Sequence, residues 1–346
     1  MLFRSLFAAA AKSGANLYYE ASVCGGIPII KSLREGFVAN QFPAIYGIVN
    51  GTCNYILSRM KAEGADFGAV LADAQKLGYA ETPPDLDIDG HDAQHKIGIL
   101  ASLAHGFWVD HHEIHTEGIR HVSKIDMEFA NKLGYTIKLL GIAKQIDDLR
   151  YTIDASKSQS ARKSKIKNRK CGVQVSVYPT LIPNAHVLAS VNGVFNACFV
   201  RGDVVGDTLF YGRGAGKDAT ASAVLSDVAD AALDLKNGGK VRVAPFVAHA
   251  KAGRVMPMDE IVSRYYVRFS VVDKPGVLAK ISAIFAAAKI GISSVIQPEG
   301  HEGESVPLIF MIHDAPNAAM RKALEKISKL PAVKGKPVMF RVESFE

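Results

Sequence analysis

The chain has 346 residues, of which 48% are hydrophobic and 22% charged, with a formal net charge of +7. A globular protein of two or three domains fits this length and composition. No apolar run approaches the roughly 18 residues of a membrane span, which excludes a membrane-spanning segment. The four cysteines show neither a C-x-x-C motif nor the spacing of metal ligands, so we expect reduced thiols in a cytoplasmic protein.

The first predicted element is a helix in residues 1–15. This stretch imitates a signal peptide, because Arg4 precedes an apolar run, but Lys12 cuts that run short. We therefore predict a helix that leads into a strand at residues 16–21.

The segment 78–96 (GYAETPPDLDIDGHDAQHK) gathers many carboxylates beside a single lysine, Lys96. The acids are Glu81, Asp85, Asp87, Asp89 and Asp92. Its spacing copies the start of a calcium loop, but the twelfth position, which must be a carboxylate, is Lys96. This excludes calcium and leaves a carboxylate cluster around one ammonium group. Such a cluster suits the binding of a charged small molecule and the movement of a proton.

An amphipathic helix follows, because apolar residues recur at the spacing of a core-facing stripe: Ala93, Ile97, Leu100 and Ala104. We expect Asp89 to be its N-cap, with Asp92 completing a carboxylate form of the capping box. Asp92 and Lys96 then lie one turn apart on the same face. An ordinary ion pair worth roughly 0.3–0.5 kcal/mol would explain them, but the flanking acids favour a binding site.

A basic stretch interrupts the middle of the chain at residues 149–171. It holds eight basic residues and one acid, Asp154, and so accounts for the whole formal net charge. Its low apolar content is typical of a solvated, disordered insertion between strands. Nucleic-acid binding is the alternative, but Tyr151 is the only aromatic residue there, so we predict no nucleic-acid partner.

A glycine-rich loop, Gly212 to Gly216, follows a predicted strand at 208–211 and opens a predicted helix at 218–235. The amides of such a loop can meet a phosphate or the edge of a cofactor. Tight packing between the strand and the helix explains the glycines about as well.

The last third of the chain has its own pattern. Strands are predicted at 265–272, 292–297, 307–313 and 337–342, and helices at 277–288 and 317–329. This βαββαβ order is that of a ferredoxin-like domain. In a purely structural reading of the first turn, Pro275 occupies the first helical position and Gly276 avoids crowding.

Six segments of the chain resemble homoserine dehydrogenases, which interconvert L-aspartate 4-semialdehyde and L-homoserine with NAD or NADP. They are GYAE with Asp87 and DGxDxxxK (78–96), EASVCGGIPII (20–30), GIVNGTCNYIL (47–57), YPTLIP (178–183), ASVNGVFNA (189–197) and YGRGAGKDATASAVLSD (211–227). The resemblance implies an α/β enzyme of threonine and methionine biosynthesis, whose catalytic domain has a mixed sheet with helices.

The resemblance also implies roles for individual residues. Lys96 would transfer the proton at the substrate oxygen with Asp92 as its partner, and Glu81 and Asp87 would hold the substrate ammonium. The cofactor would contact Gly78, Gly214 and Gly216. A Na⁺ or K⁺ ion would bind the backbone of Glu20, Val23, Gly25 and Ile27.

The N-terminus departs from the family, whose members begin with a Rossmann unit that carries G-x-G-x-x-G. This chain has no such motif, and we interpret residues 1–25 as the remnant of that unit. We therefore expect that the chain alone does not oxidise NADPH with aspartate semialdehyde. The preference between NAD and NADP is not encoded in the residues present.

The segment VVDKPGVLAKIS (271–282) resembles ACT modules, which bind amino acids. The resemblance implies effector contacts at Asp273 and Gly276, threonine as the effector, and a homodimer or homotetramer. We predict a catalytic domain at 26–236, with 212–235 returning toward the cofactor, a linker at 237–263 and an ACT domain at 264–346. The alternative function is that of a non-catalytic amino-acid sensor.

Overall fold

The computed structural model describes residues 2–146, 172–239, 242–250, 253–298, 301 and 303–345. The basic stretch predicted at 149–171 lies outside the described residues. The α-helices are α1 (Leu2–Ser13), α2 (Ile29–Lys31), α3 (Gly51–Glu63), α4 (Phe67–Lys76), α5 (Asp85–Ile88), α6 (His91–His105), α7 (Lys124–Lys132), α8 (Lys217–Lys236), α9 (Val277–Ala287) and α10 (Asn317–Ile327). None of the described helices is both long and apolar enough to cross a membrane.

The strands of the described residues belong to one mixed sheet with the order β6-β5-β1-β3-β4-β11-β8-β10-β9, while β2 and β7 each pair with β4. Their bounds are β1 (Ala44–Ile48), β2 (His115–Thr116), β3 (Tyr135–Ile146), β4 (Gly172–Pro183), β5 (Phe195–Gly202), β6 (Gly206–Arg213), β7 (Arg254–Val255), β8 (Val262–Val272), β9 (Ile292–Ile296), β10 (Ser305–Pro316) and β11 (Val333–Val342). The predicted class, a mixed sheet with helices, is confirmed.

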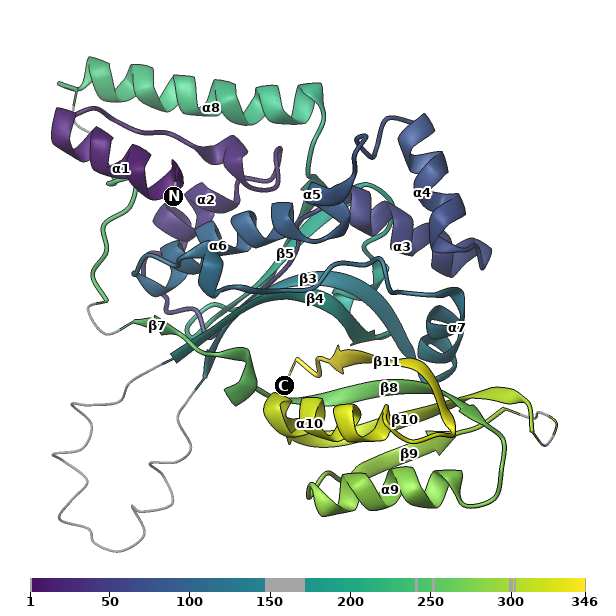
Figure 1. Ribbon diagram of the computed structural model, residues 1–346. Helices are drawn as coiled ribbons and strands as arrows, with labels where there is room; N and C mark the ends of the chain where they lie inside the picture. The colour runs from purple at the N-terminus through teal and green to yellow at the C-terminus, as the bar shows by residue number, and fades with distance from the viewer. Residues whose placement is uncertain are drawn as a thin grey trace, which may run out of the picture.

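Strands β3 and β4 are buried on both faces, because a hydrophobic core lies on each side of them. Side chains of β3 alternate: Leu139 faces a large core, and Leu140 faces a smaller one on the opposite side of the sheet. Helices α3, α6 and α7 cover the first face, on the upper side of β3 and β4 in Figure 1. The smaller core is rich in aromatic rings, and Phe345 near the C-terminus closes it.

The C-terminal third forms the predicted ferredoxin-like βαββαβ unit, with strands in the order β11-β8-β10-β9 and every pair antiparallel. Its own core lies between these strands and helices α9 and α10. The unit joins the rest of the molecule edge to edge, because β11 pairs in parallel with β4. In Figure 1 it lies below the long strands.

The strand predicted at residues 16–21 was wrong, and the structural alternative for the turn at Pro275 does not hold either. Residues 16–21 form an extended segment and a 3₁₀ turn (Glu20–Ser22), with no strand partner among the described residues. Tyr18 instead donates a hydrogen bond to Asp234 of α8, and the Glu20 carboxylate accepts the amides of Ile30 and Lys31 at the start of α2. At the other end of the chain, Gly276 is the N-cap of α9, so Pro275 precedes the helix.

Candidate active site

The predicted pair of Asp92 and Lys96 forms on α6. Lys96 Nζ donates to Asp92 Oδ2 at 2.8 Å and to the carbonyl of Val49 at 3.1 Å. The two side chains are 21% and 25% exposed, so water and a small ligand reach the ammonium group while the protein fixes its position. Val49 lies between β1 and α3, so the lysine connects α6 to the start of α3.

Asn50 organises the carboxylates, a role that the sequence analysis missed. Its amide Nδ2 donates to Asp87 Oδ1 at 2.7 Å and to Asp92 Oδ2 at 2.9 Å. Its Oδ1 accepts the amide of Cys53 and so caps α3. The sequence shows an asparagine between an apolar strand and a helix, which is the position of a helix cap. It does not show that the partners of this side chain are carboxylates 37 and 42 residues later.

The expectation that five carboxylates surround Lys96 was wrong for Asp85 and Asp89. Both turn to Arg120: its Nε donates to Asp89 at 2.5 Å, and its Nη2 donates to both acids. The Arg120 hydrogen bond holds the pKa of Asp89 below its usual value, although partial burial opposes this shift. Sequence proximity had placed these acids at Lys96, whereas the short helix α5 carries them to its other side.

The predicted capping box of α6 was also wrong. Asp89 ends α5, and the N-cap of α6 is Gly90 at φ +85°, with no side-chain cap. Only glycine adopts this conformation without strain. Its Cβ position would also lie 3.1 Å from the methyl group of Thr116. The turn between α5 and α6 therefore packs directly on the end of β2.

The remaining segment residues lie at the rim of the site. The Glu81 side chain is exposed and takes part in none of the ion pairs among the described residues. Gly78 has φ +73°, and the carbonyl of its neighbour Tyr79 accepts the hydroxyl of Thr52 at 2.6 Å. The loop after α4 is thus tied to the first turn of α3, beside Asn50.

The two glycine-rich loops, 23–27 and 212–216, lie against one another. A Cβ atom at Gly25 would come within 2.6 Å of the Gly214 carbonyl, and the Gly26 amide donates to the Arg213 carbonyl at 3.1 Å. Cys24 and Gly25 both have positive φ, at 58° and 48°. Gly25 is therefore required by close backbone approach as well as by backbone conformation.

The loop before α8 has features that fit a bound cofactor. Gly216 is the N-cap of α8 at φ +109° with no side-chain cap, so the first amides of the helix face outward from the loop. Under Gly214 lies Asn196, whose Oδ1 is buried and finds no hydrogen-bond partner among the residues that the structure describes. An unsatisfied buried acceptor calls for a donor, and the carboxamide NH₂ of a nicotinamide is one.

Two buried thiols lie behind the site, Cys24 and Cys198, with 3.6 Å between their Sγ atoms. The hydrogen bond between the two thiols lowers the pKa of Cys24 against the effect of burial, and Lys96 adds to the lowering. The same hydrogen bond and burial both raise the pKa of Cys198. Loop 23–27 therefore lies within electrostatic range of the lysine.

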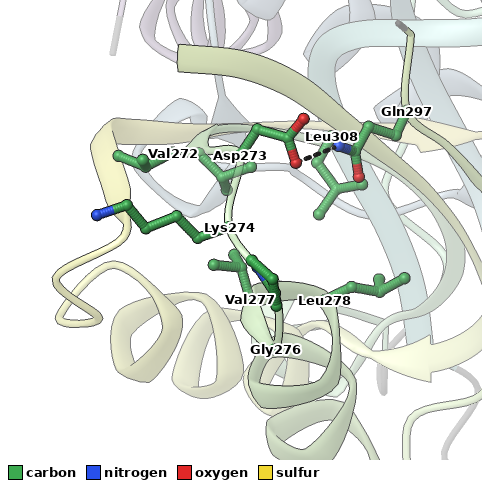
Figure 2. A pocket seen from close by; sticks show the side chains of 10 residues that line it. Val272, Asp273, Lys274, Gly276, Val277, Leu278, Gln297 and Leu308 are labelled. Carbon is green, nitrogen blue, oxygen red and sulfur yellow. Dashed lines mark hydrogen bonds between the residues drawn. The ribbon is translucent and has the colours of Figure 1, made fainter. Parts of the chain in front are cut away.

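A second site lies in the C-terminal unit, where the turn after β8 borders a cavity of about 410 Å³ (Figure 2). Asp273 contributes a negative charge and Lys274 a positive charge to the wall of this cavity, and Leu278 and Leu308 give it apolar surface. Gln297 donates to Asp273 at 3.0 Å. A Cβ at Gly276 would meet nothing within 4 Å, so this glycine, at φ +85°, serves the backbone conformation and not the relief of crowding.

Two family models match the chain: homoserine dehydrogenase over residues 28–229 and ACT domain over residues 265–332. The homoserine dehydrogenase of Pseudomonas aeruginosa is 39% identical over 342 residues, which cover 98% of this chain and 74% of that protein.

Solved structures agree. A homoserine dehydrogenase of Thiobacillus denitrificans superposes with a TM-score of 0.86 at 40% identity, over 98% of this chain and 73% of that one. A hyperthermophilic archaeal homoserine dehydrogenase in complex with NADPH has a TM-score of 0.52 at 28% identity, over 67% and 60% of the two chains. The chain belongs to the homoserine dehydrogenase family of oxidoreductases and carries a C-terminal ACT domain.

Proposed function

We propose that Lys96 is the proton-transfer residue for the interconversion of L-aspartate 4-semialdehyde and L-homoserine, with Asp92 as its partner. The observation that carries this proposal is the partly exposed ammonium of Lys96, held between Asp92 and the Val49 carbonyl. An ammonium group has three N–H donors, and the described contacts use two of them. The third donor serves the substrate oxygen.

In the reductive direction a bound nicotinamide supplies a hydride to the aldehyde carbon. Negative charge then develops on the aldehyde oxygen, where the ammonium of Lys96 stabilises it and donates the proton that completes the hydroxyl group. Asp92, fixed by Asn50, holds the lysine in place and stabilises its charged form before the transfer and again once the lysine has been reprotonated. Solvent reaches both side chains and returns the proton to Lys96.

Asp87 and Glu81 would hold the substrate ammonium. Asn50 satisfies one oxygen of Asp87, and the other oxygen remains for a ligand. Glu81 is exposed, and we assign it to the same ammonium group as the second carboxylate.

For the cofactor we propose NADP or NAD, with contacts at Gly78, Gly214 and Gly216. The unsatisfied acceptor on Asn196, the uncapped start of α8 and the NADPH complex of the archaeal relative support this assignment. These residues suit the nicotinamide end, and they leave the choice between NADP and NAD open.

Titrations of the 346-residue chain with L-homoserine, NADPH and NADH test this function. The enzyme assignment expects binding of homoserine and of a nicotinamide, with homoserine affinity about tenfold lower in Asp87→Asn, because a charged hydrogen bond is lost. Homoserine binding without any nicotinamide binding, also in a chain with upstream residues restored, would support the amino-acid sensor instead. Unchanged affinity in Asp87→Asn would remove this residue from the substrate site.

The ACT domain implies the binding of a small amino acid, and we propose its site at Asp273 and Gly276. The carboxylate of Asp273 suits the ammonium of a free amino acid, and the uncapped first turn of α9 suits its carboxylate. L-threonine is the first effector to test. Asp273→Asn should abolish its binding, and Asp259→Asn, an exposed acid elsewhere in this part of the chain, is the control.

Three further assignments belong to the proposal. The turn 23–26 leaves carbonyls outside helix and strand, and hard monovalent cations (Na⁺ or K⁺) prefer such ligands, here Glu20, Val23, Gly25 and Ile27. The domain limits are those predicted above.

Edge strand β6 exposes Leu209 and Tyr211, which supports assembly into a homodimer or homotetramer. Light scattering of the purified chain measures the number of subunits.

A further inference from the structure

The junction between the ACT domain and the catalytic domain contains a buried arginine. Arg341 lies on β11 opposite Thr180 of β4, and its side chain is only 3% exposed. Its guanidinium donates to Glu117 Oε1 at 3.0 Å and to Asn317 Oδ1 at 2.9 Å, and it lies 4.4 Å from the ring centre of Tyr178. One arginine thus connects the ACT domain to the catalytic sheet.

Glu117 is the catalytic-domain partner in this junction. It also contacts His115 Nε2 at 2.6 Å, and its backbone amide donates to the Val177 carbonyl at 2.8 Å. Burial acts to raise the pKa of Glu117, but the hydrogen bond from His115 and the charge of Arg341 outweigh it and lower the pKa to about 2. Glu117 is therefore a fixed anion at neutral pH.

The residues after Glu117 run directly onto the substrate-binding turn. The Ile119 amide donates to the Ile88 carbonyl at 2.8 Å, and both side chains are fully buried. A Cβ atom at Gly118 would overlap the Ile88 carbonyl, so only glycine permits this approach. No layer of side chains separates the 117–120 segment from helix α5.

Arg120 ends this segment with its bonds to Asp85 and Asp89, the first residue of α5 and the residue that ends it. Between these two acids lies Asp87, the proposed substrate ligand. The arginine thus clamps both ends of the one-turn helix, while Asn50 holds the Asp87 side chain from the other side.

Strand β8, which pairs with β11 beside Arg341, also lines the cavity proposed for the effector. Tyr265 of β8 pairs with Arg341, and seven residues further along β8 lies Val272 at the cavity wall, about 23 Å away at the rise of a β-strand. A ligand that moves β8 would therefore act on Arg341 through this strand pairing.

We propose that the 117–120 segment couples the ACT domain to the substrate site, with Arg120 as a positioning residue for Asp87 and the Arg341–Glu117 pair as the connection to β11. This inference rests on the proposed role of Asp87. Coupling of this kind is reciprocal, so a ligand at the substrate site must alter the ACT strand as much as an effector alters the substrate site.

Hydrogen exchange of the full chain, with and without L-homoserine, tests the coupling. In the wild type, homoserine should slow exchange in residues 85–92 and also in residues 338–343. In Glu117→Gln, which keeps the shape but not the charge, protection should remain at 85–92 and disappear at 338–343. The control is Glu343→Gln, because Glu343 bonds Lys144 across the same junction without touching the 117–120 segment; it should retain the wild-type pattern.

Homoserine affinity tests the positioning role. Arg120→Gln should weaken binding about 3- to 10-fold, the usual range for coupled positions, and Arg120→Lys should restore part of the affinity. Arg242 bridges Asp230 and Asp234 with the same four-residue spacing and similar exposure, so Arg242→Gln is the matched control and should bind normally.

The outcomes separate the two proposals. Equal protection at 338–343 in the wild type and Glu117→Gln, no protection there in the wild type, or unchanged affinity in Arg120→Gln would each overturn the coupling. Failure of the wild type to bind homoserine would instead overturn the substrate role of Asp87. Arg120 is half exposed, so its variants test the idea even where Glu117→Gln does not fold.

Discussion

Replacement of Asn50 separates two functions of one side chain. Asn50→Ser keeps an acceptor for the Cys53 amide but loses both donors to Asp87 and Asp92, whereas Asn50→Ala loses the cap as well. A hydrogen bond to a charged group is worth about 1.5–3 kcal/mol when buried. Water reaches both carboxylates in part, so we expect Asn50→Ser to lower the free energy of unfolding by about 2–3 kcal/mol. Loss of the cap should cost Asn50→Ala about 1 kcal/mol more.

Urea denaturation of the wild type and both variants at pH 7 measures these differences, and a titration with L-homoserine follows the effect on the site. Both variants should bind homoserine more weakly than the wild type, because Asp87 and Asp92 lose their common donor. A matched control is Asn192→Ser, since Asn192 contacts Lys138 and Ser58 away from the carboxylates. If Asn50→Ser unfolds and binds homoserine like the wild type, the bridging role of Asn50 is wrong.

Two further predictions concern single positions. Burial lowers the pKa of His105 to about 4, and its Nε2 has no partner; the unfolded chain therefore binds more protons between about pH 4 and 6.5, and stability rises with pH across this window. His105→Phe should remove this dependence and be about 1–2 kcal/mol more stable than the wild type at pH 5, and equal pH profiles would refute it. Gly118→Ala should lose about 1–3 kcal/mol of stability through overlap with the Ile88 carbonyl, whereas Gly36→Ala, in open space, should lose far less in the same thermal unfolding assay.

The predictions that the structure confirmed rested on the regular spacing of residues along one helix or strand. The stripe on α6 and the four-residue separation of Asp92 and Lys96 follow from helix geometry alone, which sequence specifies locally. The ferredoxin-like order of the last third could be predicted for the same reason. Its strands and helices differ in the spacing of their apolar residues, so each element can be recognised from its own segment of sequence.

Contacts between residues far apart in the sequence could not be predicted. The sequence placed Asp85 and Asp89 in the same carboxylate cluster as Asp87, yet the one-turn helix α5 brings these two acids to Arg120 while Asp87 contacts Asn50. The continuity of the sheet from β4 into β11 was likewise hidden, since a parallel pairing between distant strands leaves no local signal. The 117–120 segment gains its importance only from that pairing.

The most direct test of the account is the kcat of Lys96→Met in the reduction of L-aspartate 4-semialdehyde with NADPH. Wild type and variant are compared in the same background, with upstream residues added where the 346-residue chain alone does not turn over. We expect kcat to fall about 100-fold or more, the usual contribution of a general acid. Homoserine affinity should stay within about threefold of the wild type, since Asp87 remains in place. A kcat close to that of the wild type would contradict the proton-transfer role of Lys96.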